Sequence, residues 1–252
     1  MKLLIRALRV IFTAYALIIF IASMLILLPA YLIVFTFRNK EQAPHAAHAV
    51  SRTWGKVIWV LYFIRFKCHF KNRIDPDKTY VFVANHRSLC DIPCYALSCR
   101  NTFRFLAKAE LGRIPVFGFI IKNIYVMVER DSKKDRSRSM EAMQKSIETG
   151  ISVFICPEGT RNITDMPLLP FKDGAFRLAI KMQCPIGVLT LTNSQKLLHP
   201  KRPFELSPGI IEGYWEEPIP TAGLSDSDLP ALKQKVMHLM TKRLEAGMNV
   251  DS

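Results

Sequence analysis

The longest apolar stretch of this 252-residue chain lies near its start. Residues 10–37 carry no charge, and Lys and Arg residues flank them on both sides. A run of this length can cross a bilayer as one tilted helix, and it exceeds the apolar part of a signal peptide, which has about 7–15 residues. Pro29 offers an alternative, a kinked or hairpin insertion that enters and leaves through one face of the membrane. We predict a membrane anchor over residues 1–40.

A second apolar stretch runs from Trp54 to Ile64 and contains Trp and Tyr, which favour the headgroup level of a membrane. It is typical either of a helix at the membrane interface or of a helix buried against a sheet. Residues 42–50, rich in Ala and His, are predicted to link it to the anchor. We therefore divide the chain into the anchor (1–40), a linker with an interfacial helix (41–65) and a folded domain (66–252).

Within the folded domain, short apolar runs alternate with amphipathic segments. We predict strands at 66–72, 80–84, 102–106, 123–129, 152–156, 186–192 and 207–213. We predict helices at 88–99, 137–149, 172–183 and 229–246. This alternation is typical of an α/β fold in which helices pack on the faces of a sheet.

The charge of the chain is strongly positive, with a formal net charge of +14. Residues 1–75 hold eleven Lys and Arg against Glu41 and Asp75. Such an excess beside an apolar anchor indicates attraction to anionic lipid, at about 1 kcal/mol for each basic residue near the surface. It would also suit an acidic carrier protein or an anionic substrate. Nucleic acid is excluded as a partner, because no recognised binding motif is present and a long uncharged run is foreign to such modules.

His86 and Asp91 follow the apolar run 80–84, so His86 is expected at the carboxyl end of a strand, where open α/β sheets place ligands. If a helix begins near Ser88, the Asp91 carboxylate lies about one turn on and can reach the imidazole. It would hold one ring nitrogen protonated and leave the other free to accept a proton. The alternative is that both residues only cap the start of a helix.

Glu158, Gly159, Thr160 and Arg161 follow a second apolar strand in the same way. Gly159 allows close backbone approach, and Arg161 offers a planar fork that matches phosphate oxygens. Glu158 can orient Arg161 or accept a hydrogen bond from a substrate hydroxyl. A base beside a phosphate clamp indicates group transfer onto a phosphorylated alcohol.

His86, Cys90 and Cys94 are spaced four residues apart and are candidate metal ligands. However, the chain contains no Cys-x2-Cys pair, and a structural zinc site normally takes four protein ligands. A chain that faces the cytoplasm also keeps its thiols reduced. We therefore expect no metal site.

Three ordered motifs between residues 80 and 165 resemble those of the glycerolipid acyltransferases. Asn85 to Asp91 resembles motif I, NHxSxxD. Lys108 to Leu111, with Ile114 to Gly118 and Arg130, is similar to motif II, and Phe154 to Arg161 is similar to motif III, FPEGTR. The strand at 185–192 departs from motif IV, because its proline opens the strand and none stands at the centre.

The resemblance implies a mixed sheet flanked by helices and an enzyme without a cofactor. His86, oriented by Asp91, would deprotonate the free hydroxyl of 1-acyl-glycerol 3-phosphate. That hydroxyl would attack acyl-CoA or acyl-carrier protein and give phosphatidic acid. The residues that would bind the acceptor phosphate are Lys108, Arg130, Glu158, Gly159, Thr160 and Arg161.

Three alternatives stay open. The acceptor could be another lysolipid, such as a lyso-ornithine lipid, or glycerol 3-phosphate, and the chain could be a non-catalytic lipid-binding protein. The basic residues at both ends of the anchor leave its orientation open. The thioester donors of the family imply a catalytic domain on the cytoplasmic face of a membrane, the inner membrane of a bacterium being the expected one.

Overall fold

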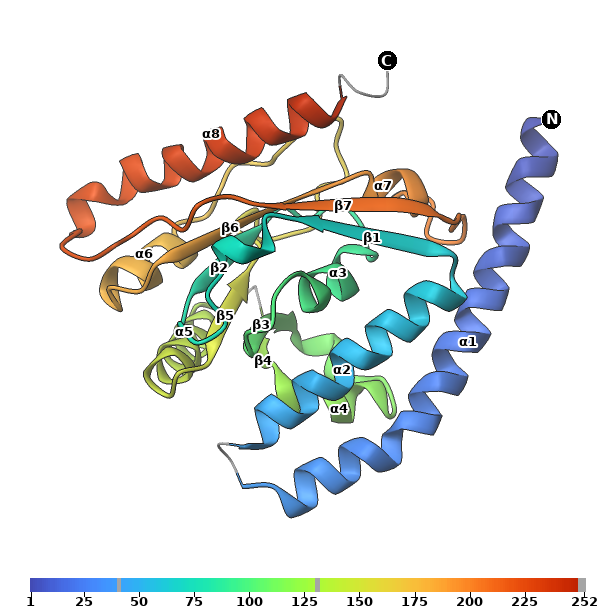
Figure 1. The fold of residues 1–252 in the computed structure, drawn as a ribbon, viewed down its shortest axis with the longest axis horizontal. Coiled ribbons are helices and arrows are strands. Elements are labelled where there is room, and N and C mark those ends of the chain that lie inside the picture. Colours follow the sequence, from blue (N-terminus) through green and yellow to red (C-terminus); the bar gives the residue numbers. More distant parts are fainter. Residues whose placement is uncertain (40–41, 130–131, 249–252) are drawn as a thin grey trace.

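A seven-stranded sheet forms the centre of the computed structural model, which describes residues 1–39, 42–129 and 132–248 (Figure 1). The strand order is β1-β7-β6-β2-β5-β3-β4. Strands β6, β2, β5, β3 and β4 run parallel, and β7 is antiparallel to β6. The sheet is therefore mixed, which confirms the predicted fold class. The strands are β1 (Ile64–His69), β2 (Val81–Ala84), β3 (Phe103–Lys108), β4 (Val126–Val128), β5 (Ser152–Ile155), β6 (Ile186–Thr192) and β7 (Gly209–Trp215).

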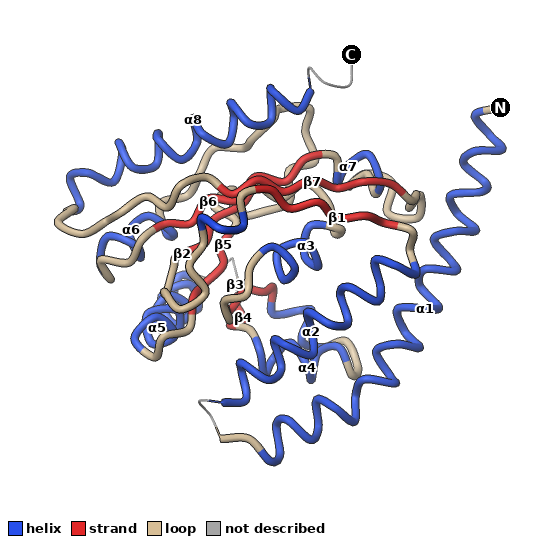
Figure 2. The backbone as a smooth tube through the Cα atoms, in the orientation of Figure 1, coloured by secondary structure: helices blue, strands red, loops and turns tan. Residues whose placement is uncertain are grey.

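Helices cover both faces of the sheet (Figure 2). Phe82 and Ala84 of β2 pack in one apolar core with residues of α2 and α3, and Val81 and Val83 pack in a second core with residues of α5, α6 and α8. This division follows from the strand geometry, since successive side chains point to opposite faces. The helices are α1 (Lys2–Phe37), α2 (Gln42–Leu61), α3 (Asp91–Ser98), α4 (Phe117–Ile124), α5 (Lys133–Glu148), α6 (Gly174–Lys181), α7 (Ser194–Leu197) and α8 (Leu229–Met248).

Helix α1 is continuous through Pro29, so the chain does not turn back at that residue. Instead α1 and α2 together form a helical hairpin along the edge of the molecule (Figure 1). By length and composition, α1 is the one helix of the described chain that could cross a membrane. Its most apolar window has a mean hydropathy of 2.8 and is only 17% buried.

Helix α2 includes residues 42–50, which we had expected to be a linker. Its second half packs on the sheet through Ile58 and Trp59, whereas Val60 and Phe63 beside them are 74% and 69% exposed. The buried interpretation of this stretch is therefore correct for one side of the helix, and an apolar row remains on the other side. The division of the chain at residues 40 and 65 stays a prediction.

Several predicted boundaries were wrong, and helices α4 and α7 were not predicted. Strand β1 ends at His69 rather than at 72, and α5 begins at Lys133 rather than at 137. The strand expected at 123–129 is shorter, because α4 extends to Ile124 and β4 begins at Val126. Phe117, Ile120, Ile121 and Ile124 recur at helical spacing and pack against the α1–α2 hairpin, an arrangement that an apolar run alone does not distinguish from a strand. The helix after motif I begins at Asp91 rather than near Ser88.

Gly118 allows α4 to approach the preceding turn, and its substitution tests this contact. A Cβ at Gly118 would lie 2.3 Å from the carbonyl oxygen of Gly112. We expect Gly118→Ala to lower the free energy of unfolding by about 1–3 kcal/mol through overpacking, measured by thermal or denaturant unfolding. The matched control is Gly55→Ala in α2, where a Cβ meets only Leu97 at 3.7 Å. A Gly118 variant as stable as the control would contradict the contact.

Candidate active site

His86 and Asp91 form a hydrogen-bonded pair at the carboxyl end of β2. His86 Nδ1 lies 2.9 Å from Asp91 Oδ2, and the same carboxylate oxygen accepts the backbone N–H groups of Arg87 and Ser88, both at 2.7 Å. Asp91 is fully buried, whereas the His86 ring is partly exposed. With Nδ1–H donating to the carboxylate, Nε2 is left to accept a proton. The carboxylate therefore organises the turn before α3 and orients the imidazole. It does not cap the helix, since α3 begins without a side-chain hydrogen bond at its N-cap residue.

Glu158 holds the main chain of His86 in place. Its Oε1 accepts the N–H of His86 and its Oε2 accepts the N–H of Leu169, both at 2.9 Å. Glu158 is buried, and burial raises its pKa while these two hydrogen bonds oppose the rise. The sequence suggested that Glu158 orients Arg161 or meets a substrate hydroxyl. Because both oxygens are engaged by amides, the structure gives it a positioning role instead.

Two asparagines that the sequence analysis did not single out as site residues add hydrogen bonds around His86. Together with Glu158 they form a clamp that holds the main chain of His86 in place. The N–H of Asn162 donates to the carbonyl of His86 at 2.8 Å. The side chain of Asn85 donates to the carbonyl of Leu191 at 2.9 Å and accepts its N–H at 2.8 Å, which ties the turn to β6. The first asparagine of motif I was the available signal for this role, since an amide that both donates and accepts can pair with a strand backbone.

Arg161 is the candidate cation that the structure leaves unengaged. It is half-buried, its Nε is buried without a hydrogen-bond partner, and it makes no ion pair within the described ranges. Lys108, at the end of β3, is exposed and pairs with Glu110 at 2.9 Å. Parallel β2, β5 and β3 bring His86, Arg161 and Lys108 to the same edge of the sheet. Arg130 lies outside the residues that the structure describes.

Gly159 and Thr160 shape the turn before Arg161. Gly159 has a φ of +72°, a left-handed conformation that costs a residue with a side chain about 1–2 kcal/mol. Its N–H closes the turn onto the carbonyl of Cys156 at 3.0 Å. Both residues are exposed, so their backbone is accessible from the side on which Arg161 follows.

Gly187, in the strand that departs from motif IV, packs closely against aromatic rings. Gly187 of β6 faces the ring of Phe82, and a Cβ there would lie 2.6 Å from it and 3.4 Å from Trp215. The two aromatic rings, 5.2 Å apart between centroids, fill the space into which a larger residue would project. A larger residue at Gly187 would therefore displace the rings of Phe82 and Trp215.

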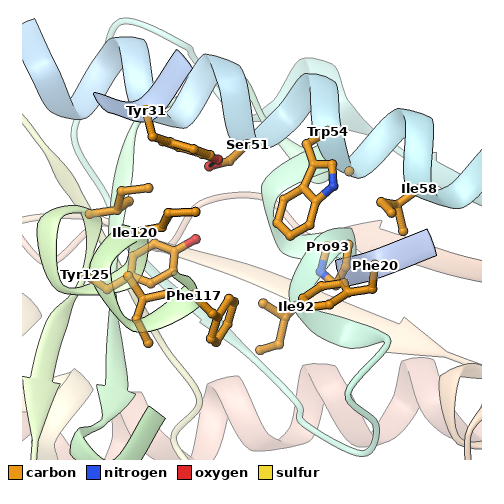
Figure 3. A pocket seen from close by; sticks show the side chains of 13 residues that line it. Phe20, Tyr31, Ser51, Trp54, Ile58, Ile92, Pro93, Phe117, Ile120 and Tyr125 are labelled. Atoms are coloured by element: carbon orange, nitrogen blue, oxygen red, sulfur yellow. Dashed lines mark hydrogen bonds between the residues drawn. The ribbon is translucent and has the colours of Figure 1, made fainter. Parts of the chain in front are cut away.

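An apolar cavity of about 110 Å³ lies between α1, α2, α3 and α4 (Figure 3). Ile92 and Pro93, which directly follow Asp91, form part of its wall. Tyr31 and Ser51, from α1 and α2, bond to each other at 2.8 Å and so leave an apolar lining at that end. The cavity lies between the α1–α2 hairpin and α3, the helix that begins at Asp91.

Cys90 and Cys94 are poor metal ligands in this setting. Burial raises the pKa of Cys90 to about 12 and that of Cys94 well above its usual value. Metals bind the thiolate, which this environment disfavours. No group of three metal-ligating side chains occurs in the part of the chain that the structure covers.

Comparisons with known proteins agree with this geometry. The family model Acyltransferase matches residues 65–191. The 1-acyl-sn-glycerol-3-phosphate acyltransferase alpha of Mus musculus is 31% identical over 71% of this chain and 64% of its own length. A Chlamydomonas reinhardtii protein named 1-acyl-sn-glycerol-3-phosphate acyltransferase is 26% identical over 85% and 63%. The chain thus spans less than two thirds of these curated relatives.

A solved structure has the same fold. The crystal structure of the 1-acyl-sn-glycerophosphate (LPA) acyltransferase PlsC from Thermotoga maritima aligns with a TM-score of 0.79 and 23% identity. The alignment covers 96% of this chain and 97% of that one. The family model includes motifs I to III and half of the chain, and this chain therefore belongs to the acyltransferase family.

Proposed function

We propose that this chain transfers an acyl group from a thioester to the free hydroxyl of 1-acyl-glycerol 3-phosphate, which gives phosphatidic acid. The observation that carries the proposal is the oriented His86 imidazole at the same sheet edge as an unpaired arginine, Arg161. The names of the relatives support the same acceptor. The donor would be acyl-CoA or acyl-carrier protein.

The reaction needs one base and no acyl-enzyme intermediate. His86 Nε2 takes the hydroxyl proton while the oxygen attacks the thioester carbon. The tetrahedral intermediate then expels the thiolate, so the C–S bond breaks as the ester forms, and the imidazolium returns its proton to the sulfur. General-base catalysis of this kind contributes about 10²–10⁴-fold, and positioning of both substrates supplies much of the rest.

The surroundings of the pair suit an acceptor with a phosphate and an acyl chain. Arg161 can bind phosphate oxygens through two parallel hydrogen bonds, with Lys108 as a second charge. The apolar cavity would receive an acyl chain, since its lining is apolar and Ile92 and Pro93, the two residues after Asp91, form part of its wall. A phosphate-free lysolipid would leave the arginine without a partner.

The acceptor resides in a membrane, and we propose that α1 brings the domain to it. Several hydrogen bonds join α1 to α2 and to the residue that follows α2. The hydroxyl of Tyr62 donates to the carbonyl of Ala16 at 2.6 Å, and the indole N–H of Trp54 donates to the hydroxyl of Ser23 at 2.9 Å. Because α1 is bound to the domain along its length, an insertion from one side is favoured over a free span. The donors are cytoplasmic, so the domain would face the cytoplasm, in a bacterium at the inner membrane.

The first prediction for this function concerns the base. His86→Ala should lower the rate of acyl transfer by about 10²–10⁴-fold because no group replaces Nε2, and Asp91→Asn should lower it severely because the imidazole loses its orienting carboxylate. Turnover of labelled thioester donor by purified protein measures both. His238→Ala, which removes an exposed histidine of α8, is the control. A His86 variant with near-control turnover would leave a non-catalytic lipid-binding protein as the explanation.

The second concerns the acceptor phosphate. Arg161→Ala should raise the acceptor KM by about 10–100-fold and leave the donor KM nearly unchanged, because a charge-assisted hydrogen bond to phosphate is lost. The kinetics should be compared for 1-acyl-glycerol 3-phosphate, glycerol 3-phosphate and a lyso-ornithine lipid. A wild-type preference for the phosphate-free lipid would overturn the assignment of Arg161.

The third concerns the membrane. Ile18 and Ile26 of α1 are 67% and 76% exposed. The double substitution Ile18→Lys and Ile26→Lys should weaken flotation with vesicles, since a Lys costs about 2.5–3.5 kcal/mol at the centre of a membrane and less at its surface. Activity toward acceptor in detergent micelles should remain, which controls for folding. Undiminished flotation would mean that another surface holds the protein on the membrane.

A further inference from the structure

A second group of cationic and titratable side chains lies beside motif I, on the segment that follows β6 and α7. His199 to Arg202 form a turn in which the N–H of Arg202 donates to the carbonyl of His199 at 2.9 Å. The N–H of Lys201 donates to His199 Nδ1 at 3.2 Å. The turn is attached to the site, since Ser88 Oγ donates to the carbonyl of Leu198 at 2.9 Å. Its position relative to His86 is therefore fixed.

Arg87, the residue after His86, belongs to this group. It donates through one terminal nitrogen to the carbonyl of Thr164 at 3.1 Å, and its Nε is buried without a partner. Burial lowers the pKa of His199 below its usual value, and the charges of Arg202 and Lys201 lower it further, with a contribution from Arg87. These like charges are thus close enough to act on one imidazole.

Acidic side chains only partly balance the group. Arg202 pairs with the buried Glu205 at 3.4 Å, but Glu205 also pairs with Arg6 at 2.8 Å. Asp165 acts on His199 and opposes the neighbouring cations. Lys201 is exposed and makes no ion pair within the described part of the chain. A positive potential without a protein partner therefore remains at this turn.

The sheet order places this turn and the cations assigned to the acceptor after strands on opposite sides of β2, although the loop after Arg161 reaches Arg87 through Thr164. Arg161 and Lys108 follow β5 and β3, on one side of β2, whereas the turn at 199–202 follows β6, on the other side. The proposed reaction joins two phosphate-bearing substrates at His86. Each can then approach from its own side, with its reacting atom at the imidazole.

We propose that Arg87, His199, Lys201 and Arg202 bind phosphate on the carrier of the acyl thioester, an inference that rests on the proposed function. Both carriers offer such a group, because coenzyme A and acyl-carrier protein share a phosphopantetheine arm. Each guanidinium group can bind two phosphate oxygens through parallel N–H groups, and Lys201 adds a single positive charge. With Nδ1 of His199 accepting the N–H of Lys201, its Nε2–H is left to donate to the same anion.

The test is the double variant Arg87→Gln with Lys201→Gln. Its KM for acyl-CoA should rise about tenfold or more, since two charge-assisted contacts are lost, while the acceptor KM stays unchanged. With acyl-pantetheine, which carries no phosphate, the variant and the wild type should be equal. An effect on both acyl-CoA and acyl-carrier protein identifies the shared phosphopantetheine phosphate as the ligand. An effect on acyl-CoA alone identifies the phosphates of its nucleotide.

Lys235→Gln on α8, an exposed lysine far along the chain, is the matched charge control, and thermal unfolding checks the fold of each variant. An equal loss with acyl-pantetheine, a raised acceptor KM or an unchanged KM for acyl-CoA would overturn the site. Calorimetric titration of full-length protein with coenzyme A alone separates this proposal from the proposed function. If the wild type transfers no acyl group yet binds coenzyme A through Arg87 and Lys201, the function fails and the site stands.

Discussion

The site depends on the two hydrogen bonds that the buried carboxylate of Glu158 accepts from backbone amides. The carboxylate accepts the N–H of His86 with one oxygen and the N–H of Leu169 with the other. A buried charge without such partners would be strongly unfavourable, so the two loops must meet for Glu158 to be accommodated at all. The hydrogen bond from Asn162 to the carbonyl of His86 closes the connection from the other direction. Because the main chain of His86 is held on both sides, the imidazole needs only the Asp91 hydrogen bond to fix its direction.

This clamp is possible because the sheet is parallel at its centre. Strands β2 and β5 are neighbours and run in the same direction, so residues 85–91 and 157–162 leave the sheet at one edge although some 70 positions separate them. Strand β6 on the other side of β2 supplies Leu191, which pairs with the side chain of Asn85. The side chains of the candidate site therefore lie on loops, and the distances between these loops are set by the pairing of the strands before them. Preorganisation of this kind is what a general base requires, since its efficiency depends on distance to the proton it removes.

Much of the fold could be predicted from the sequence because its strands are short apolar runs followed by polar turns. The runs at 80–84, 152–156 and 186–192 correspond to β2, β5 and β6 within about one residue. Helix α4 could not be separated from the strand that follows it, since Phe117 to Val128 is apolar almost throughout. His86, Asp91 and Arg161 carry recognisable chemistry at strand ends, and their placement at one edge followed from the alternation of strands and helices. The partners of Glu158 are backbone amides, which have no signature in a sequence, so its positioning role was visible only in three dimensions.

Helix α1 of the helical hairpin combines a cavity wall with an exposed apolar surface, a relation that the motifs alone do not reveal. Phe20 and Tyr31 of α1 line the cavity that begins at Ile92, while Ile18 and Ile26 of the same helix face outward. The wall that would hold an acyl chain and the surface that would meet the bilayer are therefore two sides of one helix. Any displacement of α1 on a membrane would change the shape of the cavity, because the Tyr31–Ser51 and Trp54–Ser23 hydrogen bonds hold α1 against α2. Under the proposed function, membrane attachment and acyl-chain accommodation would be coupled through the packing of this one helix, so a substitution on its outer face should be tested for its effect on both.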